Sequence, residues 1–418
     1  AAAWRISEEK FMKDRFQWID NLKLRVSYGT NGNRTSGRYA TLAKMQNKNN
    51  FVDKSTGYVF GDGGTGELLQ VMKSLPNPNL KWETTKSLNI GLDFSVLDNR
   101  LFGNYEFYVS DTKDLLYDIE IPHLNGMVDN KIPTNIGKLQ NIGHEFSITG
   151  IPIRTKDFEW TVTGNFSLNK NKVKTILGID ANGDGKEDDL ISSNIFIGKP
   201  LDPIYDYNII GMYQMSDHLN GNIPNGFSYG MYKIEDIDQD GKYTAANDRK
   251  ILGYKDPLYR FSIQNSFRYK DFELNVFINS VQGGKNHYLD QPLKKLPIPD
   301  HLTNSPYLKF DYWTPENPTA KYRQLGFFNS SLGSAFSPYV SRSFIRLQEL
   351  SLCYNVPTDF LKKIHVNRAR IFVSASNLFT ITNWDGWDPE AGQGMTYSLD
   401  NSGYPTMKSY TLGINFEF

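Results

Sequence analysis

The sequence predicts an all-β protein made of long antiparallel strands, and three observations lead to that prediction. Aromatic residues reach 14% of the chain, with 26 Phe and 24 Tyr, and such side chains are enriched in strands. Apolar and polar residues alternate over stretches of about 9–11 residues, as in a strand that has one apolar face. Pro, Gly, Asn and Asp gather between these stretches, where the chain is expected to turn.

The alternation is clearest in five stretches that follow one another along the chain. In the first, Leu22, Leu24 and Val26 alternate with Lys23 and Arg25. The other four are residues 87–94, 158–168, 260–269 and 409–418, and the last of them ends on Phe418. Residues near 100–110, 142–150, 272–280, 342–355 and 369–378 alternate less regularly. The pattern therefore predicts about ten strands.

The predicted connections are of two kinds. Residues 96–100 and 154–159 are short enough for tight hairpin turns. Other connections run for about 30–80 residues, and this combination of short turns with long loops is typical of a barrel in a bacterial outer membrane.

The same alternation fits a soluble β-sandwich, in which each strand has one buried face. Two features favour the membrane barrel. The predicted strands are longer than the average strand of about 5–6 residues. The charged residues Lys23, Arg25, Arg260 and Arg268 also stand between apolar neighbours, as on a face that lines a water-filled interior.

The composition argues against several other classes of protein. The 46 basic and 46 acidic residues cancel, so no net charge favours a nucleic acid partner. Cys353 is the only cysteine, which rules out an internal disulfide and a thiolate-rich metal site. No apolar run is long enough to predict a transmembrane helix. The first ten residues lack the features of a signal peptide, so we expect an exported form to begin further upstream.

Several blocks of the sequence carry a family resemblance. They are LKWETTKSLNIGLDF (80–94), TKDLL (112–116), NIGKLQNIGHEFSI (135–148), IGKPLDPIYDYNIIGMYQ (197–214), DIDQDGKYTAANDRKILG (236–253), YWTPENPTAKY (312–322), SFIRLQELSLCYNVP (343–357) and SASNLFTITNWDGWDPE (374–390). With the terminal Phe418, these blocks make the chain similar to the SusC/RagA-type family of TonB-linked outer-membrane transporters of the Bacteroidetes. Two departures are visible: Asp206 stands where the family usually has Gly, and the Asp-rich loop is one residue longer than usual.

The resemblance implies that residues 1–418 are the C-terminal part of an antiparallel transmembrane barrel of about 22 strands with long extracellular loops. The N-terminal plug, the TonB-contacting segment and the early strands have no counterpart in these residues. Because an unclosed sheet leaves backbone groups unpaired in lipid, the missing strands must come from another part of the same polypeptide or from another chain. The resemblance also implies location in the outer membrane, contact with its lipid, and TonB-dependent import of a glycan fragment or a peptide. The expected partners are a SusD-like surface lipoprotein and, through the absent N-terminal parts, the TonB complex. The residues leave the cargo open.

The loop DIDQDG is the clearest ligand motif. Asp236, Asp238 and Asp240 occupy the first, third and fifth positions of a calcium loop, and a glycine follows at the sixth. The twelfth position should supply a carboxylate but is Asn247, and Asp248 follows it. We therefore predict a structural calcium site formed by the four aspartates, with a solvated Asx turn as the alternative.

The same spacing recurs in DANGDG, where Asp180, Asn182 and Asp184 are followed by Gly185. This second run lacks a convincing closing ligand. A solvated turn is therefore the favoured interpretation, and a second calcium site is the alternative.

Two other classes of function stay open. A secreted β-rich carbohydrate-binding or adhesion protein fits the alternation and predicts solubility without detergent. A β-rich hydrolase needs two carboxylates, for which Asp388 and Glu390 are the candidates, although an Asp-Pro pair in a loop is more commonly a turn. His123, His144 and His287 lack metal-ligand spacing, and no nucleophile or nucleotide motif is present. We therefore predict no catalytic residue, no required cofactor and no enzyme.

Three tryptophans in the predicted loops, Trp313, Trp384 and Trp387, have two interpretations. Their rings suit stacking on sugars. They equally suit anchoring of loops or a place in an interfacial aromatic girdle, which we favour.

Overall fold

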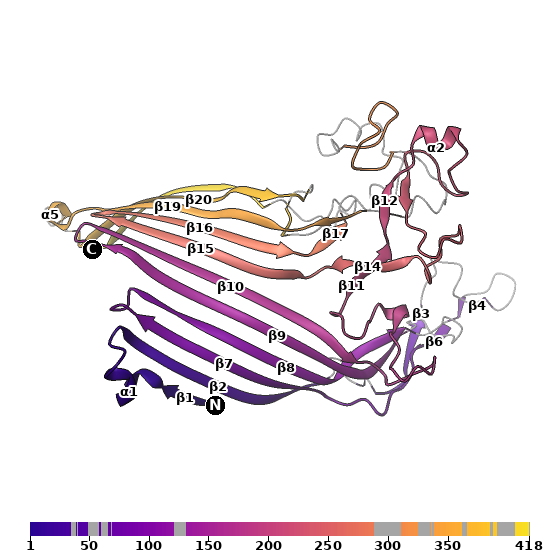
Figure 1. Ribbon diagram of the computed structural model, residues 1–418, viewed down its shortest axis with the longest axis horizontal. Coiled ribbons are helices and arrows are strands. Elements are labelled where there is room, and N and C mark those ends of the chain that lie inside the picture. The colour runs from indigo at the N-terminus through magenta and orange to yellow at the C-terminus, as the bar shows by residue number, and fades with distance from the viewer. Residues whose placement is uncertain are drawn as a thin grey trace. The chain divides into compact units, whose positions relative to one another are not determined.

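A computed structural model shows an all-β chain. It describes residues 1–34, 39, 41–48, 58–59, 66–67, 69–120, 131–287, 311–324, 336, 338–361, 366–384, 388–390 and 406–417. Its largest element is a single sheet of eleven strands (Figure 1).

The strands of this sheet are neighbours in the order of the sequence, and the pairs whose register is resolved are antiparallel. They are β1 (Ala2–Arg5), β2 (Ile19–Asn33), β7 (Glu83–Val96), β8 (Leu101–Glu120), β9 (Lys131–Arg154), β10 (Phe158–Thr175), β15 (Pro257–Tyr269), β16 (Phe272–Gly283), β19 (Phe344–Asn355), β20 (Arg368–Thr382) and β21 (Ser409–Glu417). Each of the ten predicted stretches coincides with one of these strands. Sequence reasoning missed only β1, which has four residues and is too short for a recognisable alternation.

Several strands are much longer than predicted. β8 has 20 residues, β9 has 24 and β10 has 18, whereas crossing a bilayer takes about 9–11. The predicted length was therefore wrong for these three strands. Backbone pairing continues beyond the stretch in which the side chains alternate, because a ladder of hydrogen bonds does not need an apolar face.

The chain divides into two compact units. The first comprises residues 1–94, 104–145 and 169–202, and the second comprises residues 95–103, 146–168 and 203–418.

In the second unit, the strand register sorts side chains onto two faces. One register row across six strands is apolar: Trp160, Phe267, Leu274, Leu352, Val373 and Leu412. The adjacent row points to the other side and is polar throughout: Thr161, Ser266, Asn275, Ser351, Ser374 and Thr411. Leu412 is 74% exposed and Val373 is 50% exposed. The apolar face is thus turned outward, which confirms the alternation predicted from the sequence.

Aromatic side chains line the edge of the apolar face that lies next to the short turns. Phe158, Tyr269, Phe272 and Tyr354 are successive register partners on β10, β15, β16 and β19. The rings of Phe272 and Tyr354 lie 4.7 Å apart. Such a row is typical of the aromatic girdle at a membrane interface.

The two short turns are formed as predicted. Between β7 and β8, Leu97, Asp98 and Asn99 all have positive φ angles, of 61°, 55° and 58°. Between β9 and β10, the amide of Thr155 donates to the carbonyl of Phe158, at 2.8 Å.

The other connections contain small elements. They are η1 (Ile6–Glu8), α1 (Lys10–Lys13), β3 (Lys44–Lys48), β4 (Tyr58–Val59), β5 (Gly66–Glu67), β6 (Leu69–Ser74), η3 (Ile191–Ser193), β11 (Pro203–Tyr207), β12 (Ile209–Met212), α2 (Met215–Leu219), β13 (Tyr232–Ile234), β14 (Arg249–Tyr254), β17 (Lys285–His287), β18 (Tyr339–Ser341) and α5 (Thr358–Leu361). Among the described residues, no helix is long and apolar enough to cross a membrane.

The first unit has its own apolar core, at the ends of β8, β9 and β10. Ile136, Val173, Ile176 and Ile195 are buried together there. Gly137 lets the backbones of β9 and β10 approach, and its amide donates to the carbonyl of Ile176 at 2.5 Å. A Cβ at Gly137 would lie 1.8 Å from the carbonyl oxygen of Thr175. Only glycine fits at this position.

This close approach gives a prediction for Gly137→Ala in the complete protein. The added methyl group meets backbone, which cannot rotate away, so we expect a loss of stability of about 1–3 kcal/mol. The measurement is the midpoint of thermal unfolding in detergent, read from heat-modifiable mobility on gels. Gly29→Ala is the matched control, because nothing lies within 4 Å of the Cβ position there. Equal midpoints for the two variants would contradict the role assigned to Gly137.

Candidate functional site

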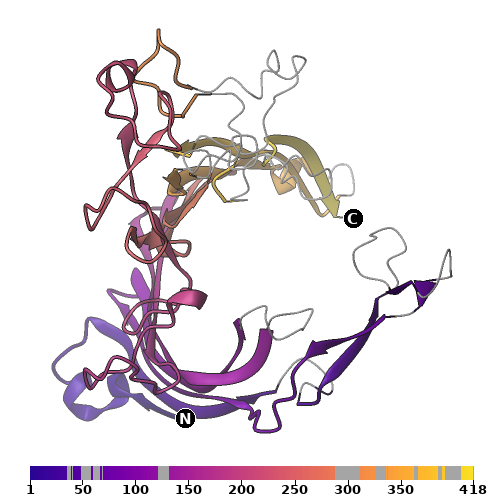
Figure 2. The same cartoon turned by 90° about the vertical axis from the view of Figure 1, so that its right-hand side faces the viewer.

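Residues 203–254, in the long connection between β10 and β15, form a small body together with Phe336 from a later connection. Figure 1 shows this body beyond the ends of β15 and β16, and Figure 2 shows the same end of the strands toward the viewer. β11 pairs with β14, and β12 pairs with β13. Its core consists of Tyr232, Ile234 and Phe336, and Phe227 and Tyr243 pack against it. Burial raises the pKa of Tyr232 to about 12. The core is thus aromatic and dry.

Trp313 fastens residues 311–324 to this body. The indole is 1% exposed, and its Nε1 donates to Oε1 of Gln214 at 2.9 Å. Gly230, at a φ of +75°, makes room for the ring, since a Cβ there would lie 2.6 Å from Trp313 Cε3. A buried ring cannot stack on a sugar, so Trp313 anchors the loop.

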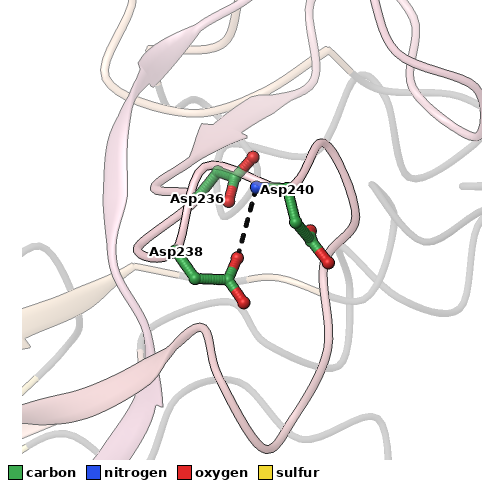
Figure 3. A group of neighbouring side chains, drawn as sticks. All are labelled: Asp236, Asp238 and Asp240. Atoms are coloured by element: carbon green, nitrogen blue, oxygen red, sulfur yellow. Dashed lines mark hydrogen bonds between the residues drawn. The ribbon is translucent and has the colours of Figure 1, made fainter.

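Three of the four predicted metal ligands lie together in this body (Figure 3). One carboxylate oxygen from each of Asp236, Asp238 and Asp240 lies within 4.8 Å of the others. The amide of Gly241, at a φ of +77°, donates to Oδ2 of Asp236 at 2.9 Å. Oδ1 of Asp236 is buried and has no hydrogen-bond partner among the described residues. Three oxygens this close suit a hard cation such as calcium, which takes oxygen ligands at about 2.3–2.6 Å.

Asp248, the fourth predicted ligand, is placed differently. It is fully buried, and its two oxygens accept the amides of Ile237 and Thr244, at 2.9 and 2.7 Å. Asp248 therefore closes the loop through backbone hydrogen bonds. The adjacent Asn247 donates from Nδ2 to Oδ2 of Asp238 at 2.6 Å, so the side chain at the twelfth position reaches the carboxylates.

The second run repeats these internal bonds. The amide of Gly185 donates to Oδ2 of Asp180 at 2.9 Å, as Gly241 does to Asp236. The amide of Asp184 donates to Asn182 Oδ1, at 2.9 Å. The two loops share one backbone conformation, and only the first brings three carboxylates together within the described part of the chain.

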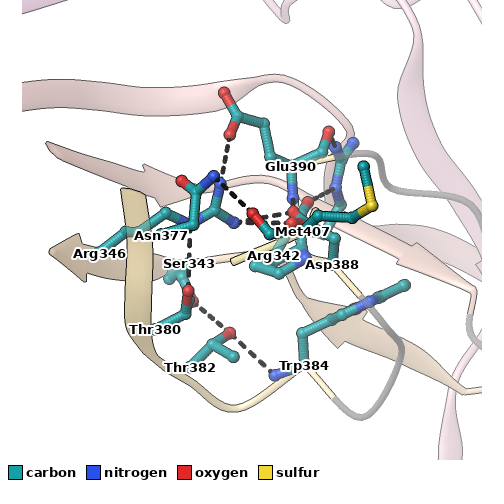
Figure 4. A network of polar contacts seen from close by, with 11 residues as sticks. Arg342, Ser343, Arg346, Asn377, Thr380, Thr382, Trp384, Asp388, Glu390 and Met407 are labelled. Atoms are coloured by element: carbon teal, nitrogen blue, oxygen red, sulfur yellow. Dashed lines mark hydrogen bonds and ion pairs between the residues drawn. The ribbon is translucent and has the colours of Figure 1, made fainter. Parts of the chain in front are cut away.

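The other predicted pair of carboxylates, Asp388 and Glu390, belongs to an ion-pair network in which Asp388 is buried and Glu390 is exposed (Figure 4). Arg346, on β19, is 3% exposed. Its Nη2 donates to both oxygens of Asp388 at 2.9 Å, and its Nη1 donates to Glu390 Oε2 at 2.9 Å. Its Nε donates to the hydroxyl of Thr380 on β20, at 3.0 Å. One guanidinium therefore links two strands of the sheet to the loop that follows β20.

A second arginine holds the same loop by its backbone. Arg342 donates from Nε to the carbonyl of Pro389 at 2.8 Å and from Nη2 to that of Glu390 at 2.7 Å. Burial lowers the pKa of Arg342.

The environment of Asp388 does not suit a hydrolase. Burial opposes ionisation of its carboxyl, but hydrogen bonds from Thr406, the Glu390 amide and Arg346 outweigh burial and lower its pKa. A general acid needs the opposite shift. Both carboxylates bind one cation, so the pair serves as a clamp.

The remaining residues of interest have structural contacts, and Trp384 lies beside the Arg346 network (Figure 4). Trp384 is buried, and its amide donates to Thr382 Oγ1 at 3.0 Å. His144, on β9, receives or donates a hydrogen bond at Nδ1 to the hydroxyl of Tyr105, at 2.8 Å. Trp387 and His123 lie outside the described residues, as does the side chain of His287.

In the first unit, charged side chains form a network on the polar face. Arg25, on β2, binds Asp93 on β7 through Nε and Nη2, at 2.9 and 2.8 Å. Its Nη2 also reaches Glu106 on β8, at 2.9 Å. Gly91 makes this possible, since a Cβ there would lie 2.9 Å from the guanidinium carbon. Lys23 lies 3.9 Å from Asp93, so both predicted cations of β2 have acidic partners.

Asp206, the departure from the family pattern, has a structural role. Its Oδ2 accepts the hydroxyl of Tyr339 on β18, at 2.9 Å, and its Oδ1 accepts the amide of Tyr207, at 2.8 Å. Asp206 thus ties β11 to β18.

Sequence reasoning missed Arg342 and Arg346. Both stand in the block SFIRLQELSLCYNVP or directly before it. An arginine on β19, with two acidic residues in the loop that follows the next strand, β20, was the available signal. This signal becomes informative only when the structure shows that the loop folds back onto β19.

Comparison with known families gives one match. Residues 15–254 match the family described as TonB dependent receptor-like, beta-barrel.

Curated proteins of the same kind are similar over the whole chain. The TonB-dependent receptor P3 of Formosa agariphila is 34% identical over 437 residues, which cover 100% of this chain and 41% of the relative. The TonB-dependent receptor SusC of Bacteroides thetaiotaomicron is 29% identical over 431 residues, which cover 100% of this chain and 39% of the relative. The chain therefore spans about two fifths of the length of these relatives.

Among solved structures, the RagAB peptide importer in the "closed-closed" state superposes with a TM-score of 0.71 at 23% identity, over 100% of this chain and 43% of that chain. The structure of the RagAB peptide transporter gives a TM-score of 0.69 at 22% identity, over 100% and 43%. These similarities establish the fold.

The Arg346 network predicts the effect of Arg346→Met in the complete receptor. Removing the cation leaves the carboxylate of Asp388 buried without its partner, which costs about 3–5 kcal/mol. We expect a lower midpoint of thermal unfolding and faster proteolysis of the loop after β20. Lys13→Met is the control, because Lys13 and its partner Glu8 are 56% and 58% exposed and 2.6 Å apart, and such pairs contribute about 0–1 kcal/mol. Similar losses in both variants would contradict a buried clamp at Arg346.

Proposed function

The chain belongs to the TonB-dependent receptor-like β-barrel family, as a member of its SusC/RagA type in the outer membrane, and on that basis we propose that it forms the C-terminal part of the barrel of an importer. The remaining strands and the plug would come from the rest of a longer polypeptide. The transported solute would be a glycan fragment or a peptide, driven by energy delivered through TonB.

One observation supports this proposal most directly. The apolar row from Trp160 to Leu412 crosses six strands, is turned outward, and backs onto a row of hydroxyl and amide side chains. A sheet that is apolar outside and polar inside suits a wall between lipid and a water-filled passage. A secreted adhesion or carbohydrate-binding protein has no use for an exposed apolar face of this extent.

We also propose that a SusD-like lipoprotein covers the long connections, which lie at the end of the strands away from the short turns. Two findings support this pairing. A similar protein carries the name SusC, and the structural match is to a peptide transporter named RagAB. The buried anchors Trp313 and Arg346 hold the long connections in fixed positions, as a docking surface requires.

The family consists of receptors and transporters, and we propose that this member has no catalytic activity. The only acidic pair that suggested hydrolysis, Asp388 with Glu390, is bound to Arg346.

Transport is tested by deleting the parent gene in its own host and measuring uptake of fluorescently labelled oligosaccharides and oligopeptides. We expect uptake of one of these two classes to fall to background in the deletion strain and in cells whose proton gradient is dissipated. Complementation with the full gene restores uptake. Unchanged uptake of both classes would contradict the proposal.

We propose that these residues belong to a longer chain and that a lipoprotein accompanies it. Both claims are tested by mass spectrometry of the native protein after detergent extraction. We expect a parent chain far heavier than the 47.8 kDa of these residues, together with a co-purifying lipoprotein. A complete protein of this mass that is soluble without detergent would favour the secreted alternative instead.

We further propose that Asp236, Asp238 and Asp240 bind calcium as a structural ion. Binding to the folded state alone raises stability by about 2.7 kcal/mol at a calcium concentration one hundred times the dissociation constant. We expect calcium to raise the unfolding midpoint of the receptor relative to a chelator. Asp238→Asn removes this increase, whereas Asp184→Asn in the second loop leaves it in place. An increase of equal size in wild type and Asp238→Asn would contradict this site.

A further inference from the structure

Residues 4–18, which comprise the end of β1 and its connection to β2, expose four large aromatic side chains. Trp4 is 49% exposed, Phe11 is 54%, Phe16 is 42% and Trp18 is 55%. Aromatic side chains this exposed in one short segment mark a surface that contacts something other than water. Residues 4–18 are called the aromatic segment below.

The aromatic segment is ordered without using these rings. The amide of Lys13 donates to the carbonyl of Glu9 at 3.0 Å, that of Phe16 to Met12 at 2.9 Å, and that of Ile19 to Phe16 at 3.0 Å. Met12 is the buried side chain of α1. The backbone bonds and Met12 hold the segment, so the four rings remain available.

The strand register places the segment on the apolar face of the sheet. Trp4 of β1 is the register partner of Leu24, and Ala2 is the partner of Val26. Leu24 and Val26 belong to the apolar side of β2, whereas Arg25 lies on the polar side with Asp93. Trp4 therefore continues the apolar side of β2.

The charges of the segment suit a phospholipid surface. Arg5, Lys10, Lys13 and Arg15 are all exposed. Glu8 accepts Lys13 at 2.6 Å, which pairs one acid with one base, and the remaining Arg5, Lys10 and Arg15 outnumber Glu9 and Asp14. Basic residues beside exposed Trp and Phe are the composition of segments that lie among lipid headgroups.

The topology determines the side of the membrane. Successive strands run in opposite directions, so the β1–β2 connection lies at the same strand ends as the short turns at residues 97–100, 155–157 and 270–271. Short turns of such barrels face the periplasm. The neighbouring leaflet of the outer membrane is then the periplasmic one.

From these observations we infer that the aromatic segment is an interfacial anchor, with Phe11, Phe16 and Trp18 inserted among the phospholipid headgroups of the periplasmic leaflet. Its basic side chains face the lipid phosphates. This inference requires only that the chain belongs to the outer-membrane β-barrel family. It does not depend on the proposed cargo, partner or calcium site.

The anchor is tested in the complete receptor, with its other cysteines replaced, in nanodiscs of phosphatidylethanolamine and phosphatidylglycerol. Nitroxide labels are attached at Phe11→Cys and Phe16→Cys, and at Lys10→Cys and Lys13→Cys as adjacent controls. Electron paramagnetic resonance then measures the accessibility of each label to oxygen, which concentrates in lipid, and to a water-soluble nickel chelate. Only material with the heat-modifiable mobility of a folded barrel is used.

We expect the ratio of oxygen to nickel accessibility to exceed one at Phe11 and Phe16 and to fall below one at Lys10 and Lys13. Leu219→Cys serves as a second control, because Leu219 is 79% exposed in α2 of a long connection, and we expect a ratio below one there. Labels at Phe11 and Phe16 that favour the nickel chelate would place the segment in water. Labels with low accessibility to both oxygen and the nickel chelate would show that protein covers the segment. Either result would overturn the inference.

Discussion

A polypeptide that crosses hydrocarbon must satisfy its backbone hydrogen bonds within the protein, because lipid offers neither donors nor acceptors. In this chain the sheet meets that requirement for the strands between its edges, β1 and β21, by pairing each strand with its neighbours along the sequence of the sheet, and the side chains then fall onto two faces by geometry alone. The requirement extends to side chains on the apolar face. Asn265 lies in that face between Phe267 and Ile263, and its Oδ1 accepts Nε1 of Trp160 on the neighbouring strand at 3.1 Å, so each polar group satisfies the other.

The polar face is subject to a different constraint, which is space. Large side chains there lie across the neighbouring strand, and a glycine stands beneath each one. Arg25 crosses Gly91, the ring of Tyr108 lies over Gly143, and that of Phe372 lies over Gly413. In each case a Cβ would collide with the crossing side chain at 2.9 Å or less. The glycines therefore permit contacts between strands that side chains of ordinary size would prevent, and the ion pair from β2 to β8 depends on one of them.

The long connections depend on the sheet in turn. A loop exposed to water is stabilised only weakly by its own few contacts. Its position is determined by side chains that are buried against the rest of the protein. Arg346, on β19 of the sheet, fixes the position of the loop after β20 by binding Asp388 and Glu390. Trp313 fixes the position of its own loop by packing into the aromatic body between β10 and β15. The surface that such a receptor presents at this end is therefore built on buried aromatic and ionic contacts.

The sequence by itself determined the ten long strands, the two tight turns and the family, because a period of two residues and the chemistry of a turn are local properties of the chain. Three carboxylates at alternate positions of one loop were visible for the same reason. Only the tertiary structure decided the lengths of β8, β9 and β10, the burial of Trp313 and Trp384, and the binding of Asp388 to Arg346, 42 residues earlier in the chain. It also assigned Asp248 to backbone amides. These features arise from burial and from contacts between distant segments. Local periodicity does not indicate which loop folds back onto which strand.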